Sequence, residues 1–531
     1  MLGDDVTMTT ATTIGDMIRQ HAGERPEKPA IILGDNVRTY ADLHAESSKV
    51  AQAMLAAGVG SQDRVAFLDK NVAEYFTMLF GAGKVNAVTV AVNWRLAPPE
   101  MAYILNHSKI KVLLIGEEFL GHLKSMDLEG DVEIVVIGED GGDYPTYAEW
   151  IAGHEATDPM APSDPEDTCY QLYTSGTTGL PKGVELTNNN FFGMMPVASK
   201  MWSFDTDSVN MVAMPLFHIA GSGWGVVGLY NGATNIMLRD VDPNELLRLI
   251  PLHGVTNALF VPAVIQFLLM MPNLAETDFS TMRSVIYGAS PISEEVLVGG
   301  MEAFGCDFCQ VYGLTETTGG VTQLDAADHD PGGPRAHLLR SAGKPIPNVE
   351  IRIVDEEGND LPDGEVGEIW IKSPQNLKAY YADPEATAKA YPEGRDESGL
   401  GWFATGDAGY MQEGFLFIHD RIKDMIVSGG ENIYPAEIEN VLMKHEGVAD
   451  AAVIGVPHEK WGETVKAIVV RAGEDSNSDD ELIAFCRENL AHYKCPTSVD
   501  AIEALPRNPS GKILKTELRK PYWQGHERMV N

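Results

Sequence analysis

A loop rich in glycine and hydroxyl side chains lies in the first half of the chain, where residues 173–183 read YTSGTTGLPKG. Glycine tolerates backbone turns that other residues cannot make, so the N–H groups of such a loop can converge on an anion. Hydroxyls and one lysine add further donors and positive charge. We therefore predict a phosphate-binding loop made of Thr174, Ser175, Gly176, Thr177, Thr178, Gly179 and Lys182.

This loop lacks the magnesium ligand of the P-loop of nucleoside triphosphatases. The lysine of a P-loop is followed by Ser or Thr, whose hydroxyl binds Mg²⁺, whereas Lys182 is followed by Gly183. A run of Gly, Ser and Thr can also be an ordinary surface turn, and the loop alone does not separate the two interpretations.

Strands and helices are predicted to alternate on the N-terminal side of the loop. One helix face is predicted from apolar residues at helical spacing, namely Leu43, Val50, Ala51, Met54 and Leu55. After it, strand-like and helical runs alternate at 64–68, 73–85, 88–91, 97–106 and 112–115. This order predicts a parallel sheet covered by helices. Such sheets bind ligands in loops at the carboxyl ends of strands, which is where the 173–183 loop would lie.

The second half of the chain has a different pattern. Alternation with period two at 351–354 and 368–372, with an Asp-Glu-Glu-Gly turn between them, predicts an antiparallel hairpin appended to the α/β body. Near the C-terminus, strands are predicted at 451–456 and 464–470 within a stretch patterned as helix, strand, strand, helix. That stretch is long enough for a small separate core.

Length and charge restrict the class of protein. A chain of 531 residues is long enough for at least two domains, and its net charge of −38 repels nucleic acid and anionic lipid. The charge leaves open whether the protein works in a salty habitat. Scattered cysteines and the lack of a basic, apolar leader predict a cytoplasmic location. The most apolar stretch, 258–271, is too short for a transmembrane segment and contains Pro262 and Gln266.

The loop and several later motifs together resemble the adenylate-forming superfamily, which includes acyl-CoA synthetases, luciferases and the adenylation domains of peptide synthetases. The resemblance extends from about Thr13 to about Lys520. The later motifs are GAS at 288–290, YGLTE at 312–316, GWFATGD at 401–407, DRIKD at 420–424 and PRNPSGK at 506–512.

The resemblance implies the fold and the domain boundaries. The expected fold is α/β, with a large N-terminal domain of α/β sheets, an appended antiparallel β region and a small mobile α+β C-terminal domain. The expected boundaries are a flexible tail at 1–12, an AMP-binding and acyl-binding domain at 13–422, and a C-terminal domain at 423–531 that carries the catalytic lysine.

The resemblance also implies ATP, Mg²⁺ and coenzyme A as cofactors and assigns the catalytic residues. Lys512 is expected to reach both the attacking carboxylate and the α-phosphate. Thr315 places a hydroxyl near that phosphate, and Glu316 holds Mg²⁺ against the phosphates. Asp407 accepts the two ribose hydroxyls, with Arg421 as its neighbour at the ribose.

Further binding roles follow from the same motifs. The backbone of Gly288, Ala289 and Ser290 is expected to line the adenine and acyl sites, and Tyr312 to stack near adenine. Lys423 matches the hinge about which the C-terminal domain rotates, and Gly429 and Gly430 match the loop that lines the pantetheine tunnel of CoA. One departure from many relatives is Ala379 before Tyr380, where they have Gly before Tyr.

The acid is predicted from the residues that match its pocket. In the resembling family the segment 216–218 gates the carboxylate pocket with an aromatic or histidine side chain. The expected pocket residues are Phe217, His218, Trp224, Val261, Gly313 and Leu314. Because most of these side chains are apolar, and a small residue such as Gly313 leaves room for a long substrate, a medium- to long-chain fatty acid is our first prediction and an aryl acid of the benzoate or cinnamate type is the alternative.

The predicted function is an ATP-dependent acid:CoA ligase that forms an acyl-adenylate and then an acyl-CoA thioester. A stand-alone adenylation enzyme that loads a carrier protein, and a luciferase-like oxidase, remain as alternatives; no fused carrier segment is present, which favours CoA. A non-catalytic nucleotide-binding module is disfavoured because Glu316, Asp407 and Lys512 are retained. The partners are then small molecules, with no nucleic acid, and the sequence leaves a homodimer open.

Overall fold

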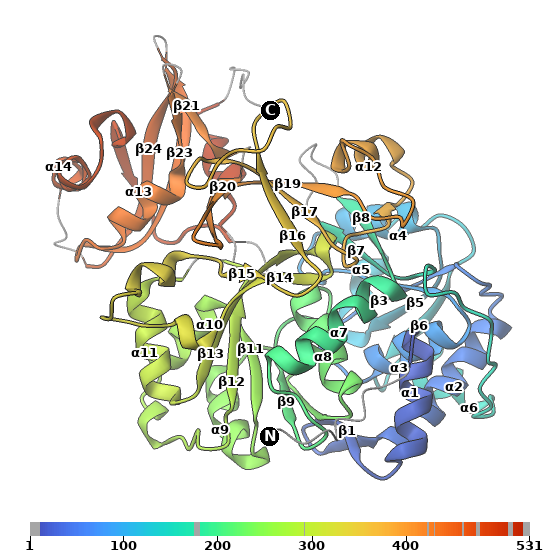
Figure 1. Cartoon of the computed structure of the whole chain (residues 1–531). Helices are drawn as coiled ribbons and strands as arrows, with labels where there is room; N and C mark the ends of the chain where they lie inside the picture. The colour runs from blue at the N-terminus through green and yellow to red at the C-terminus, as the bar shows by residue number, and fades with distance from the viewer. Residues whose placement is uncertain are drawn as a thin grey trace.

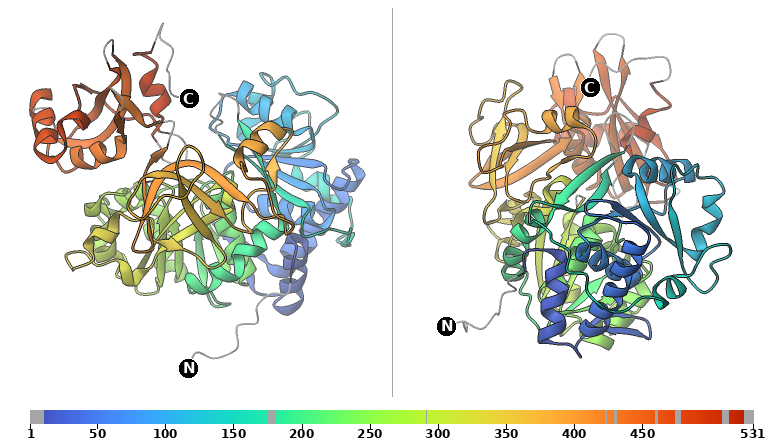
Figure 2. Two further views of the ribbon diagram at one scale, coloured as in Figure 1. Left: turned by 45° about the horizontal axis from the view of Figure 1, so that its top comes forward. Right: turned by 90° about the vertical axis from the view of Figure 1, so that its right-hand side faces the viewer.

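The computed structural model of this chain describes residues 11–174, 181–290, 292–421, 424–428, 431–458, 461–473, 478–507 and 513–523, with backbone only at 419–421, 431, 432 and 462. A large N-terminal domain, blue to light orange in Figure 1, carries a small C-terminal domain, darker orange to red, above it. Both views of Figure 2 keep the small domain at the top, away from the blue N-terminal helices. This confirms the predicted fold class. Most of the predicted tail, 1–10, lies outside the described residues.

One mixed sheet leads into the predicted phosphate-binding loop, in the strand order β18-β8-β7-β4-β3-β5-β6. Its strands are β3 (Arg64–Leu68), β4 (Val88–Ala91), β5 (Ile110–Gly116), β6 (Glu133–Ile137), β7 (Thr168–Thr174), β8 (Lys182–Thr187) and β18 (Ala379–Tyr380). The strands from β7 to β6 are parallel, whereas β8 and β18 are antiparallel to their neighbours. Thr174 therefore ends a strand flanked on both sides, at its carboxyl end.

A second mixed sheet has the order β15-β14-β13-β12-β11-β9-β10-β1-β2. Its strands are β1 (Pro29–Leu33), β2 (Asn36–Thr39), β9 (Val209–Val212), β10 (Thr234–Met237), β11 (Asn257–Phe260), β12 (Ser284–Gly288), β13 (Asp307–Leu314), β14 (Gly319–Leu324) and β15 (Lys344–Pro345). Its middle strands are parallel, and β14 turns back antiparallel against β13. The YGLTE motif begins in β13 and continues past its carboxyl end.

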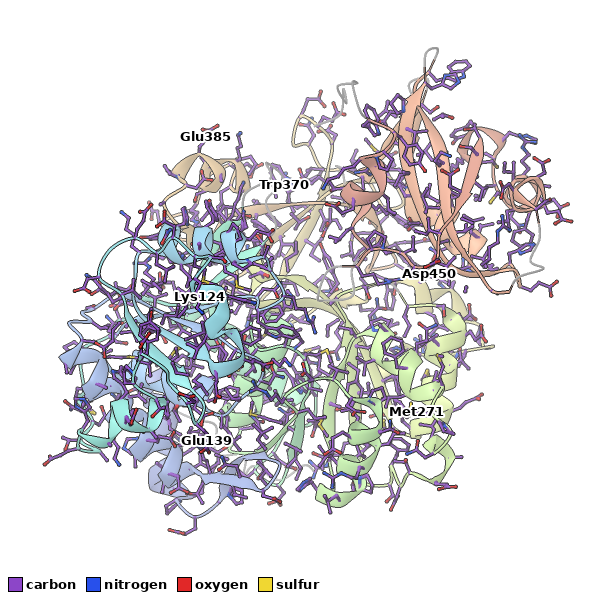
Figure 3. All side chains as sticks on the ribbon, turned by 180° about the vertical axis from the view of Figure 1, so that it is seen from behind. Lys124, Glu139, Met271, Trp370, Glu385 and Asp450 are labelled. Carbon is purple, nitrogen blue, oxygen red and sulfur yellow. The ribbon has the colours of Figure 1, made fainter. Side chains whose placement is uncertain are left out.

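The predicted hairpin belongs to a third sheet, which is antiparallel. Its strands are β16 (Glu350–Val354), β17 (Gly367–Lys372), β19 (Trp402–Gln412) and β20 (Phe415–Arg421). The pairing of β16 with β17 runs from Glu350 opposite Lys372 to Val354 opposite Glu368, which confirms the prediction. In the view of Figure 3, Glu385 and Asp450 lie on opposite sides of Trp370 of β17.

The C-terminal domain has its own sheet and core. Its strands are β21 (Ile426–Ser428), β22 (Glu431–Ile433), β23 (Val448–His458), β24 (Gly462–Arg471) and β25 (Ser498–Ala501). Its helices are α13 (Pro435–Leu442), α14 (Asp479–Asn489) and α15 (Lys515–Arg519). The two strands predicted in this region correspond to β23 and β24, and Ile438, Val453 and Leu482 are fully buried between sheet and helices.

The helices of the large domain cover the two mixed sheets. They are α1 (Ile14–Glu24), α2 (Tyr40–Ala56), α3 (Glu74–Lys84), α4 (Pro98–Ser108), α5 (Leu120–Leu123), α6 (Tyr147–Ala152), α7 (Asn188–Met201), α8 (Ile219–Tyr230), α9 (Pro243–His253), α10 (Pro262–Leu269), α11 (Glu294–Phe304) and α12 (Pro384–Ala390). Capping boxes start α2, α6 and α7 at Thr39, Thr146 and Thr187. No helix in the described ranges combines the length and apolar character needed to cross a membrane.

Helix α3 is buried on nearly all sides, because it packs against α1 and α2 as well as against the core of the large domain. Tyr75, Phe76 and Phe80 have no exposed surface, as expected for a helix that is apolar all round. The predicted apolar face of α2 packs against α3. One residue of the predicted face, Leu55, does not belong to it. Leu55 is 44% exposed, because the buried face of α2 ends at Met54 in this last turn.

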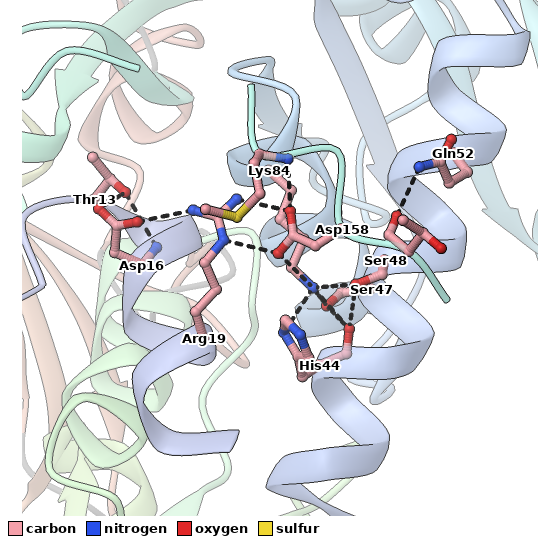
Figure 4. Close-up of polar contacts among 11 residues, drawn as sticks. Thr13, Asp16, Arg19, His44, Ser47, Ser48, Gln52, Lys84 and Asp158 are labelled. Atoms are coloured by element: carbon pink, nitrogen blue, oxygen red, sulfur yellow. Dashed lines mark hydrogen bonds and ion pairs between the residues drawn. The ribbon is translucent and has the colours of Figure 1, made fainter. Parts of the chain in front are cut away.

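The last residue of α3, Lys84, is a lysine with no exposed surface. Its ammonium group donates to the carbonyl of His44 at 2.7 Å and to the hydroxyls of Ser47 and Ser48 at 2.8 Å each. Asp158, which pairs with Arg19 at 2.8 Å, lies 3.8 Å away (Figure 4). The pKa of Lys84 is lowered to about 7, mainly by burial; the charge of Asp158 opposes this shift, and that of Arg19 adds to it.

The low pKa of Lys84 predicts a pH-dependent stability. Because the unfolded chain binds this proton up to a pKa of about 10.4 and the folded chain only to about 7, the free energy of unfolding should rise as the pH increases from 7 to 10. Lys84→Met should reduce that slope by at most about 1.4 kcal/mol per pH unit. Urea unfolding followed by tryptophan fluorescence at pH 7, 8 and 9 measures it.

The matched control for this prediction is Lys111→Met, because Lys111 is exposed. Its stability should follow the pH dependence of the parent. If the free energy of unfolding of Lys84→Met also changes in parallel with that of the parent over this pH range, the ammonium group is not the source of the pH dependence.

Candidate active site

The carboxylate of Glu316 lies where the two mixed sheets meet. It belongs to the 3₁₀ turn η3 (Thr315–Thr317), which directly follows β13, and it is 9% exposed. Its Oε1 accepts a hydrogen bond from the hydroxyl of Tyr380 at 3.0 Å and lies 3.5 Å from the hydroxyl of Thr174. The end of β7 and the edge strand β18 therefore both contact the motif that follows β13.

The turn around Glu316 is held by its own backbone and by a neighbouring segment. The N–H of Leu377 donates to the carbonyl of Glu316 at 2.6 Å. The hydroxyl of Thr317 accepts from the N–H of Leu314 at 2.9 Å, and the hydroxyl of Thr318 donates to the carbonyl of Gln375 at 2.7 Å. This clamp fixes the direction in which the Glu316 side chain leaves the backbone.

Tyr380 is a half-buried donor in this cluster. Burial and the adjacent carboxylate of Glu316 raise the pKa of its hydroxyl far above the usual value, so the hydroxyl keeps its proton and donates. The Nζ of Lys182, the first residue of β8, lies 5.1 Å from the centre of the Tyr380 ring. The predicted phosphate ligand Lys182 and the predicted metal ligand Glu316 thus contact one tyrosine.

The second pair of predicted residues joins two sheets. The hydroxyl of Tyr312 in β13 donates to Oδ2 of Asp407 in β19 at 2.7 Å, and Asp407 is 7% exposed. The N–H of Asp407 donates to the hydroxyl of Thr405 at 3.0 Å, which keeps the turn at Gly406 closed. Asp407 stands opposite Arg421 in the register of β19 and β20. Tyr312, which is predicted near adenine, and Asp407, which is predicted at the ribose, therefore lie together.

Two glycines of these motifs leave no room for a side chain. A Cβ on Gly288 would stand 2.1 Å from the carbonyl oxygen of Val311, and one on Gly313 would stand 1.8 Å from that of Gly319. Ala289, which follows Gly288, has a φ of 65°, in the left-handed region that few alanines adopt. The backbone at the ends of β12 and β13 is thus tightly packed and turns sharply, as a site that approaches a ligand with its main chain requires.

The predicted gate residues lie in an aromatic cluster before α8. The ring centres of Phe217 and His218 are 4.5 Å apart, and Trp94 meets Phe217 edge to face at 6.4 Å. Nε2 of His218 is buried and has no hydrogen-bond partner among the described residues. Burial lowers the pKa of His218 to about 4, with Arg95 as the second cause, so its ring is neutral at physiological pH.

The remaining pocket predictions occupy different surroundings. The indole N–H of Trp224 donates to the carbonyl of Met211 at 3.0 Å, and its ring packs on Trp202 and Phe204 inside the core. Val261 caps α10 at its N-terminus, and Leu314 ends β13. Trp224 and Phe217 thus both pack in the core of the large domain, but their rings contact different aromatic residues.

Several predicted site residues lie outside the described residues: Ser175, Gly176, Thr177, Thr178, Gly179, Lys423, Gly429, Gly430 and Lys512. For Arg421 only the backbone is described. Ser290 is the last described residue before the gap at 291.

Two further residues at these sites were not predicted from the sequence. The sequence gives Tyr380 only as the residue after Ala379 and predicts no role for it. Its contact with Glu316 joins residues that are 64 apart in the sequence. Arg95 carries its guanidinium 4.6 Å from the Trp94 ring and 6.0 Å from the Phe217 ring. The Gly-Tyr pattern of many relatives could have indicated that Tyr380 belongs to the site. No sequence motif indicates Arg95.

Comparison with known proteins identifies the family. The model of the AMP-binding enzyme family matches residues 18–381, and that of the AMP-binding enzyme C-terminal domain matches residues 437–512. A fatty acid–[acyl-carrier-protein] ligase of Streptomyces coeruleorubidus is 41% identical, over 96% of both chains. A long-chain-fatty-acid–CoA ligase of Mycobacterium tuberculosis is 37% identical, and a feruloyl-CoA synthase of an Amycolatopsis species 35%; each match covers 96% of this chain and, respectively, 98% and 99% of the relative.

A solved structure agrees with this assignment. The crystal structure of ATP-bound MatB from Rhodopseudomonas palustris superposes with a TM-score of 0.87 at 29% identity, covering 97% of this chain and all of that one. The expected motifs, the two family models and the relatives along the whole chain lead to one conclusion: this protein belongs to the AMP-binding enzymes, the adenylate-forming superfamily of ATP-dependent acid ligases.

Proposed function

We propose that this protein is an acid:CoA ligase that acts on medium- to long-chain fatty acids. The observation that carries the adenylation step is the position of Glu316, a buried residue that contacts Thr174 of the glycine loop and Tyr380 of β18. A phosphate-binding loop beside a fixed carboxylate is what the activation of a carboxylic acid by ATP requires. The named activities of the fatty-acid ligases among the relatives support the acid that we propose.

The proposed reaction has two steps. In the first, the substrate carboxylate attacks the α-phosphate of ATP, so that an acyl-adenylate forms and pyrophosphate leaves. Lys512 and Thr315 stabilise the charge at that phosphate, and Asp407 holds the ribose. In the second step, the thiol of CoA attacks the acyl carbon and AMP leaves, so that a thioester forms.

The residues at Glu316 fit a Mg²⁺ ion that is bound together with the nucleotide. The described part of the chain holds no group of three or more His, Cys, Asp or Glu that could bind a metal alone. Mg²⁺ is commonly held by one or two carboxylates and by substrate phosphates, and Glu316 supplies such a carboxylate. When bound, the ion neutralises charge on the phosphates as pyrophosphate leaves.

The domain arrangement is part of the same proposal. We place the boundary between residues 422 and 423, with Lys423 as the hinge and with Gly429 and Gly430 next to the pantetheine arm of CoA. The two family models, which end at 381 and begin at 437, leave the boundary between them. We also propose a cytoplasmic location, supported by the five free cysteines.

The neutral ring of His218 supports an uncharged acyl chain. A histidine with its pKa near 4 has no positive charge at pH 7 with which to bind a second carboxylate. Phe217 and Trp94 add aromatic surface beside it. An aryl acid would also suit aromatic walls, and the feruloyl-CoA synthase among the relatives keeps that alternative open.

A panel of acids tests the substrate. Pyrophosphate release should depend on ATP and on the acid, and kcat/KM should rise with chain length through the medium-chain range. Each added methylene that is buried contributes about 0.8 kcal/mol, or roughly fourfold, until the pocket is full. Acetate should therefore be a very poor substrate. If benzoate or cinnamate exceeds every linear acid, the aryl-acid ligase replaces our proposal; if no acid releases pyrophosphate, the ligase proposal itself fails.

The acceptor of the acyl group has two candidates, CoA and an acyl-carrier protein. The relative at 41% identity is named for loading an acyl-carrier protein, which specifically favours that acceptor as the alternative to CoA. Mass spectrometry of reactions that contain either CoA or a phosphopantetheinylated carrier protein identifies the acceptor. Our proposal expects acyl-CoA, and acylation of the carrier alone would overturn it.

A further inference from the structure

Tyr380 contacts two predicted ligands of ATP and Mg²⁺ with different parts of its side chain. Its hydroxyl donates to Glu316 Oε1 at 3.0 Å, and its ring lies 5.1 Å from Nζ of Lys182. We propose that Tyr380 is a positioning residue for adenylation, whose hydroxyl orients the Mg²⁺ carboxylate and whose ring places the ammonium group of Lys182 at the phosphates. This inference rests on the proposed function.

The backbone holds Tyr380 firmly in place. In β18 it pairs with Val184 of β8, two residues from Lys182. Its N–H donates to the hydroxyl of Thr387 in α12 at 3.0 Å, and the next N–H, that of Tyr381, donates to the carbonyl of Gly183 at 2.7 Å. A phenol on a fixed backbone has little freedom to turn, so the position of its hydroxyl is set by β8, which also sets the position of Lys182.

The contact should matter most for the metal. A carboxylate whose orientation is already set by a hydrogen bond loses less side-chain entropy when a metal binds. Hydrogen-bonding partners of metal ligands typically change metal affinity or activity by about 10- to 100-fold when they are removed. The ring contact, by contrast, is a cation–π interaction that does not involve the hydroxyl. The two contacts can therefore be separated by substitution.

A second tyrosine gives a matched control. Tyr380 and Tyr391 both line a groove of about 640 Å³ beside α12. The hydroxyl of Tyr391 donates to the carbonyl of Leu377 at 2.8 Å, which is a main-chain acceptor and not a carboxylate. Tyr391→Phe therefore removes a buried hydroxyl from the same wall without removing the donor to Glu316.

Calorimetric titration of ATP, with Mg²⁺ and with EDTA, tests the inference. In Tyr380→Phe the gain in ATP affinity that Mg²⁺ provides should shrink by about tenfold or more, whereas the affinity in EDTA should match the parent. In Tyr380→Leu the affinity in EDTA should fall as well, because the ring that faces Lys182 is lost. Tyr391→Phe should match the parent in both conditions, and thermal unfolding shows whether each variant is folded.

The outcomes separate this inference from the proposed function. A parent protein that does not bind ATP contradicts the proposed function. A parent that binds MgATP, with Tyr380→Phe unchanged or with Tyr391→Phe equally impaired, overturns only the role of Tyr380. If Tyr380→Phe does not fold, Thr387→Val, which releases the N–H of Tyr380, should show the same Mg²⁺-specific loss to a smaller extent, and its failure to do so overturns the inference.

Discussion

Lys512→Ala should abolish acid-dependent pyrophosphate release and leave the conversion of supplied acyl-adenylate and CoA to thioester near the parental rate. The flexible stem of lysine can bring a point charge to the attacking carboxylate and the α-phosphate, and neither group requires it once the adenylate exists. The residues that flank Lys512 are paired, since Arg507 forms a bridge with Ile513 and the N–H of Leu514 donates to the carbonyl of Pro506 at 2.8 Å.

Separate assays of the two half-reactions measure this effect. Lys520→Ala is the control, because Lys520 follows Lys512 in the same C-terminal segment of the sequence, is exposed, and pairs only with Glu517 among the described residues. It should keep both half-reactions. Equal loss of both half-reactions in Lys512→Ala would remove the role that we propose for this lysine.

Asp407→Ala should weaken ATP binding by roughly 10- to 100-fold while leaving the affinity for the acid unchanged. A hydrogen bond to a charged group contributes about 1.5–3 kcal/mol, and each 1.4 kcal/mol is a tenfold change in Kd. One carboxylate oxygen of Asp407 already accepts from Tyr312 at 2.7 Å, so the substitution also frees that phenol. Calorimetric titration of ATP and of the acid separates the two affinities.

Two further variants make this test specific. Tyr312→Phe keeps the carboxylate and should weaken ATP binding less than Asp407→Ala does. Glu397→Ala removes an exposed carboxylate from the loop before β19 and should not change the affinity. If Asp407→Ala binds ATP as the parent does, the carboxylate serves to hold Tyr312 and the turn at Gly406, and our ribose assignment is wrong.

Several local elements of this protein were determined by the sequence alone. Strands β3, β4 and β5 and helices α3 and α4 lie where the spacing of apolar residues predicts them, because a buried face imposes its period on the neighbouring residues. The hairpin of β16 and β17 was likewise predicted, from the period-two alternation of its strands and the turn between them. The family motifs added Glu316 and Asp407 as predicted site residues, although no spacing rule relates one to the other.

Only the tertiary structure decided which of these residues meet. Tyr312 and Asp407 are 95 residues apart, and Tyr380 and Glu316 are 64 apart, yet each pair shares a hydrogen bond. Each contact depends on the order of strands in a sheet and on which sheet edges adjoin, and a local sequence pattern carries no information on either. Leu55 and Trp224 make the same point for the core. Their apolar character is plain in the sequence, but whether such a side chain is exposed, as Leu55 is, or packs in the interior, as Trp224 does, depends on the elements that cover it.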